Sequence, residues 1–164
     1  MARRGDNIKE ILRALPLKEG VLAGLIATVP MTLFMFAVHR LLPGWQQYAL
    51  PPERVTDEVA EQTEVKEDMN KPESLGASLV AHFGFGSTMG ALYGPIAKRV
   101  PLPPVVKGIA FGMLVWAANY LGLLSAMKMQ ESAFNEPVRR NIIMIASHVV
   151  WGGTLGVVED LLER

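Results

Sequence analysis

Four long stretches of this chain contain no aspartate, glutamate, lysine or arginine. They are Gly20–His39, Ser74–Ala97, Gly108–Met127 and Asn141–Val158, with lengths of 20, 24, 20 and 18 residues. At about 1.5 Å per helical residue, each is long enough to cross a hydrocarbon core of about 30 Å. Lipid offers no partners for backbone polar groups, so the stretches are predicted to be α-helices.

A soluble helical bundle is the alternative, but soluble helices normally carry charge on an outer face. Gly108–Met127 is apolar all round except chiefly at Asn119 and Tyr120. The sequence therefore predicts an all-α, four-helix transmembrane bundle whose main partner is the lipid bilayer. The expected spans are about 20–42, 74–97, 108–127 and 141–162.

Composition narrows the function classes further. Lysine plus arginine and aspartate plus glutamate both number 16, and this zero net charge argues against nucleic-acid binding. Cysteine is absent, which excludes disulfides, thiolate metal sites and cysteine nucleophiles. No nucleophile–base pair stands out, so no catalytic residue is assigned and the chain is not expected to be an enzyme.

Charges gather outside the spans. Residues 1–19 form a basic segment, residues 20–164 form the membrane domain, and the loop 43–73 holds much of the acid. Lysine and arginine favour the side of the N-terminus, second loop and C-terminus over the other side by 9 to 7. This bias places both termini in the cytoplasm.

Spans two and four share a pattern of residue types. His82, Gly86, Thr88 and Gly90 align with His148, Gly152, Thr154 and Gly156, and spans one and three agree through Gly20-x-x-x-Gly24 and Gly108-x-x-x-Gly112. The chain is therefore predicted to contain two repeated helical hairpins. Small residues at four-residue spacing let helices approach closely in lipid. The predicted helix-packing glycines are Gly20, Gly24, Gly86, Gly90, Gly94, Gly108, Gly112, Gly152 and Gly156. Their faces also suggest a homo-oligomer or a larger membrane complex.

Ionisable residues inside a membrane are functional candidates. His39, His82 and His148 are expected toward one membrane face, and Asn119 is expected to hydrogen-bond across helices. Three interpretations of His82 and His148 stay open. They are structural hydrogen-bond donors, a protonation-sensitive site, or joint ligands of haem b or a divalent metal with His39 as a further ligand. No cofactor is otherwise expected, and neighbouring glycines would make room for a haem.

The chain resembles the YagU-like small bacterial inner-membrane proteins in four features. These are the proline-containing first span, Leu50-Pro51-Pro52, the row of glycines that follows the histidine of span two, and Ser147-His148 of span four. That resemblance implies a multi-pass protein of the inner membrane, linked in general terms to acid resistance, with no catalytic residues to carry over. The resulting hypothesis is a membrane protein that supports envelope or acid-stress physiology by proton or small-solute passage or by pH sensing. A bis-histidine redox subunit and a structural subunit of a membrane complex are the alternatives.

Overall fold

The computed structural model describes residues 17–41, 71–123 and 137–164, and all regular structure in these ranges is helical. The elements are α2 (Leu17–Leu41), α4 (Lys71–Ala97), α5 (Pro104–Ala118) and α7 (Val138–Glu163), and α5 continues as a π-helical segment over Asn119–Leu123. The predicted all-α fold is confirmed for these residues. The basic segment before Leu17 and nearly all of the acidic loop lie outside the described residues.

Each helix begins a few residues before its charge-free run. α5 begins at Pro104 rather than Gly108, because proline fits the first turn of a helix, where the backbone N–H has no partner. α7 begins at Val138, directly after Pro137. The helices therefore extend beyond the predicted spans at their N-terminal ends, because charge marks where lipid ends and not where a helix ends.

Three helical stretches are long and apolar enough to cross a membrane: Leu17–Leu41, Pro104–Gly122 and Val138–Glu163. The chain thus has the character of an integral membrane protein. α4 has 27 residues and is long enough. Its five glycines, together with serine, threonine and histidine, keep its most apolar stretch below the mean hydropathy of those three.

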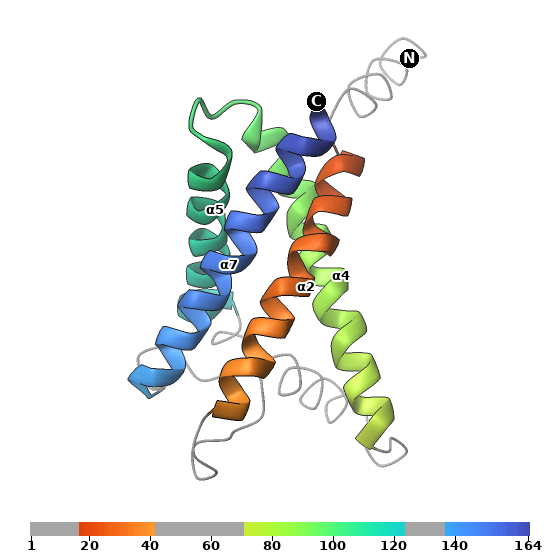
Figure 1. Cartoon of the computed structure of the whole chain (residues 1–164), viewed down its shortest axis with the longest axis vertical. Helices are drawn as coiled ribbons and strands as arrows, with labels where there is room; N and C mark the ends of the chain where they lie inside the picture. Colours follow the sequence, from red (N-terminus) through yellow and green to blue (C-terminus); the bar gives the residue numbers. More distant parts are fainter. Residues whose placement is uncertain (1–16, 42–70, 124–136) are drawn as a thin grey trace.

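The two predicted helix pairs are present. α2 packs against α4, and α5 packs against α7. α2 and α7 join the pairs at the centre, whereas α4 and α5 touch only slightly (Figure 1). A two-fold axis that relates the hairpins would make the α2–α7 contact equivalent to the α4–α5 contact. These two contacts differ in extent, so the packing does not show the predicted repeat, which stays a prediction.

The first pair is joined along a glycine seam. A Cβ added at Gly24 would collide with the carbonyl oxygen of Gly86 and lie 3.0 Å from the Cα of Gly90. A Cβ at Gly20 would collide with the carbonyl oxygen of Gly90. The two backbones are therefore in direct contact, in antiparallel register, and no larger residue fits between them.

The second pair has the same kind of seam. A Cβ added at Gly112 would lie 3.1 Å from the Cα of Gly152, and one at Gly108 would lie 2.9 Å from the Cα of Gly156. Gly94 of α4 is buried as well. The eight glycines of the two seams thus lie at helix–helix contacts. These seams are filled by the chain's own helices, so they do not supply a surface for a second copy.

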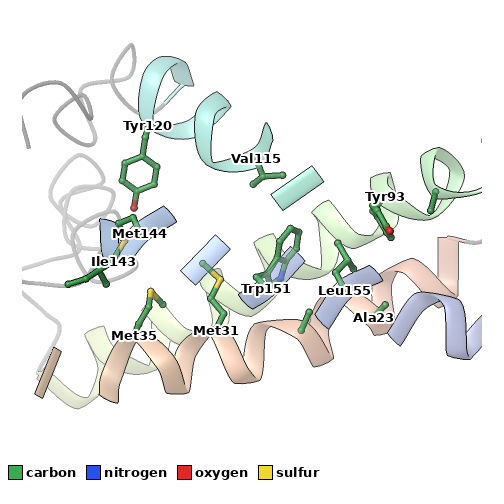
Figure 2. Close-up of a cluster of buried hydrophobic side chains, with 12 residues drawn as sticks. Ala23, Met31, Met35, Tyr93, Val115, Tyr120, Ile143, Met144, Trp151 and Leu155 are labelled. Carbon is green, nitrogen blue, oxygen red and sulfur yellow. The ribbon is translucent and has the colours of Figure 1, made fainter. Parts of the chain in front are cut away.

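Between the seams lies a core that draws on all four helices (Figure 2). Trp151 and Leu155 of α7 meet Ala23 and Met31 of α2 at its centre. Many large apolar side chains point outward instead, among them Leu33, Val80 and Leu114. An apolar exterior around a small-residue interior suits a protein surrounded by lipid.

Candidate functional site: the His82–His148 pair

His148 lies inside the bundle on α7. Its side chain is buried, and Nδ1 is 2.8 Å from the backbone carbonyl oxygen of Met144 one turn earlier. A carbonyl oxygen only accepts, so Nδ1 donates and the neutral ring keeps its lone pair on Nε2. A proton or a metal ion would therefore arrive at Nε2.

His82 comes from α4 and reaches the same region. Its ring is half-buried, and its Nε2 atom is fully buried without a hydrogen-bond partner in the part of the chain that the structure describes. The two imidazoles are close enough to interact electrostatically. The structure thus brings together the two histidines that lead the predicted seams, although α4 and α7 make few other contacts.

His39 does not join this pair. The Gly24–Gly86 contact places His82 level with Thr28, and His39 lies eleven residues further along α2. That separation is about 16 Å along the helix. The structure therefore does not bring His39 together with His82 and His148. No group of three histidine, aspartate or glutamate side chains in the described ranges could hold a metal ion.

The position of His82 and His148 along the bundle also differs from the expectation. His82 follows the start of α4 by eleven residues and His148 follows the start of α7 by ten, which puts each about 15 Å inside its helix. Because the helices begin earlier than predicted, the pair lies near the middle of the bundle and only His39 lies near its end.

Asn119 also behaves differently from expectation. Its Nδ2 donates to the carbonyl oxygen of Val115 at 2.9 Å, within its own helix and not across helices. Asn119 starts the π-helical segment, and such segments often occur at functional sites. The segment positions Tyr120, whose ring meets that of His148 edge-on with centroids 6.2 Å apart.

The structural interpretation of the histidines finds little support. The observed bond of His148 runs to its own helix, and the buried Nε2 of His82 has no partner among the described residues. The haem interpretation loses its expected space, because backbone of the facing helix already fills the space beside Gly112 and Gly152, and the Thr28 side chain fills the space beside Gly86.

Three buried ionisable residues escaped the sequence analysis: Tyr93, Arg140 and Glu159. For Glu159 a signal existed, since it follows His148 and Leu155 on one helical stripe, at i+11 and i+4. Asp160 lies at the edge of the bundle, where its carboxylate accepts a 2.8 Å bond from Arg164.

A family model described as "Protein of unknown function (DUF1440)" matches residues 40–157, which is more than two thirds of the chain. The chain belongs to this family. The DUF1440 match contains α4, α5, His82 and His148, whereas almost all of α2 precedes it. No curated protein and no solved structure matches the chain.

Proposed function

We propose that this DUF1440 protein crosses the bacterial inner membrane four times and responds to protons through His82 and His148. Connectivity supports the fourth span. α2 and α5 begin at the same end of the bundle, so the chain between them must return across it, and α4 is antiparallel to α2. α4 also carries outward apolar side chains at Val80, Phe85, Leu92 and Ile96.

The observation that carries the proton proposal is that two imidazoles from different helices lie inside an apolar bundle, within electrostatic range of each other. Histidine is the side chain whose charge ordinarily changes between about pH 5 and 8. A proton arriving at Nε2 of His148 would disfavour a second proton at His82, because two like charges would share a poorly solvated site. The pair would therefore titrate as one unit.

The groups around the pair allow such a response. His148 is packed against Tyr120 from the end of α5, and Thr28 of α2 lies level with His82. Neither group carries a charge that would neutralise an imidazolium. Protonation would push α4 away from α7, and these helices hold each other through few other contacts.

The physiological part of the proposal rests on the YagU-like resemblance, which implies a role in acid resistance. Proton uptake by a buried pair would let the membrane domain change packing as the outside becomes acidic. In the alternative form of this proposal, protons or small solutes cross the membrane along the same pair of histidines.

The test is survival after acid challenge in cells that depend on this protein. The double variant His82→Gln/His148→Gln should lose protection, because glutamine keeps polarity without titrating. His39→Gln is the matched control and should protect like the unaltered protein. Equal survival of all three would overturn the proposal, provided that immunoblotting shows equal amounts in the membrane.

Haem or metal binding is the second candidate. One observation favours it, since metal-ligating histidines usually donate their other ring N–H to a carbonyl or carboxylate, as Nδ1 of His148 does. The space beside the seam glycines is already filled by the facing helices, which argues against a bound haem. A visible spectrum with elemental analysis of the purified protein decides, and a Soret band or bound metal lost in His148→Gln would favour this candidate.

A further inference from the structure

A carboxyl group lies buried near the end of the bundle opposite to His39. Glu159 of α7 is 0% exposed, and neither of its oxygens meets a hydrogen-bond donor within the described residues. An ionised carboxylate in such a place carries a large desolvation cost unless it is paired. The Glu159 carboxyl is therefore expected either to have a hydrogen-bond or charge partner or to be protonated.

Tyr93 of α4 supplies the complementary group. Its side chain is 1% exposed, and its hydroxyl is buried without a hydrogen-bond partner in the part of the chain that the structure covers. Tyr93 and Glu159 each lie about one turn before the Lys98–Glu163 ion pair, on helices that run in the same direction, and the two groups interact electrostatically. Two unsatisfied polar groups from different helices thus share one buried place, and a carboxyl and a phenol can each donate to or accept from the other.

Glu163, one turn further along α7, is the charged group with the largest influence on Glu159, and Lys107 and Lys98 also lie within electrostatic range of it. Nζ of Lys98 lies 3.2 Å from a carboxylate oxygen of Glu163, and Nζ of Lys107 donates to the carbonyl oxygen of Ala97 at 3.0 Å. On α7, Asp160 pairs with Arg164. The first turn of α2, at the same end of the bundle, carries Lys18 and Glu19.

This site is separate from the histidines. Glu159 follows His148 by eleven residues, about 16 Å along α7. Fully buried apolar side chains lie between them: Leu155, Ala23 and Ala27. The two sites are therefore separate, and Glu159 lies nearer to the end of the bundle opposite to His39.

We propose that Glu159 and Tyr93 form a second proton-binding site that exchanges with water at the end of the bundle opposite to His39. A proton from water binds a carboxyl oxygen of Glu159, Tyr93 hydrogen-bonds to the acid, and release returns the proton to water at that face. The Lys98–Glu163 ion pair covers this exit. The two proton sites give the bundle one titrating group for each side.

Infrared spectroscopy of the full chain in lipid nanodiscs tests this directly. A protonated carboxylic acid shows a carbonyl stretch well separated from carboxylate bands. At about pH 6, where exposed carboxyls are ionised, the unaltered protein should show one such band. Glu159→Gln should abolish it, while the neighbouring variant Asp160→Asn should keep it. Tyr93→Phe should shift the band to higher frequency, because a hydrogen bond to the carbonyl is lost.

Absence of the band from the unaltered protein between about pH 5 and pH 7 would overturn the proposal, as would its survival in Glu159→Gln. Should Glu159→Gln fail to fold, the Tyr93→Phe shift decides, and an unshifted band counts against the site. The double histidine variant should keep the band. Failure of the histidine proposal and failure of this one are therefore distinguishable.

Discussion

Trp151 of α7 donates its indole N–H to the hydroxyl oxygen of Thr28 of α2, at 3.3 Å across 123 residues of sequence. The same hydroxyl donates to the carbonyl oxygen of Gly24 at 2.8 Å and fills the notch left by Gly86 of α4. One threonine oxygen thus touches three helices. It lies level with His82, so the two hairpins meet where the proposed proton site lies.

The Thr28–Trp151 bond should be measurable as a coupling energy. In a double-mutant cycle with Thr28→Val and Trp151→Phe, we expect about 0.6 kcal/mol, the usual size for such bonds inside membranes. The measurement is unfolding by SDS in mixed micelles. Thr88→Val, at an exposed threonine that bonds only to its own helix, is the control and should show no coupling to Trp151→Phe. Zero coupling at Thr28 would mean that the hairpins are not joined there.

The glycine seams should be intolerant of even one methyl group. Gly86→Ala and Gly152→Ala place a Cβ against Thr28 Oγ1 and against the carbonyl oxygen of Gly108, and overpacking of this kind costs about 1–3 kcal/mol. Their neighbours provide matched controls. An added Cβ meets nothing at Gly84 and only ordinary contacts at Gly153. Unfolding midpoints that fall equally in seam and control variants would contradict the seams.

The fourth span can be tested by single-cysteine labelling, since the chain has no cysteine of its own. Val80 of α4 is 75% exposed, and Leu33 and Leu114 on the confirmed apolar helices are 64% and 63% exposed. Spin labels at all three should be accessible to oxygen and shielded from a water-soluble nickel chelate. A label at Val80 that the chelate reaches, with the other two shielded, would place α4 outside lipid.

The charge pattern predicted the helices, and the four-residue spacing predicted their packing faces. The spacing did not determine which glycine of one helix contacts which glycine of its neighbour. When the two hairpins are aligned by sequence, Gly24 corresponds to Gly112. In the structure, the Gly24–Gly86 contact corresponds instead to the Gly108–Gly152 contact, which lies one helical turn away. Glycines repeat every turn, so a shift of one turn leaves the pattern unchanged.

The candidate site was predicted in part for a similar reason. His82 and His148 lead their seams, which placed them on buried faces. Whether His39 joins them depends on depth, and depth depends on where α4 and α7 begin. Glu159 was missed because a charge near a chain end ordinarily faces water, and only three-dimensional packing against α4 and α5 shows that it is buried.

Nitrogen NMR of ¹⁵N-histidine-labelled protein in lipid nanodiscs tests the proton proposal most directly, because the chain has only three histidines to assign. The imidazoles of His82 and His148 should titrate as a coupled pair, so His82→Gln should move the titration midpoint of His148 while His39→Gln leaves it unchanged. Independent titration of the two rings, each indifferent to loss of the other, would contradict the account.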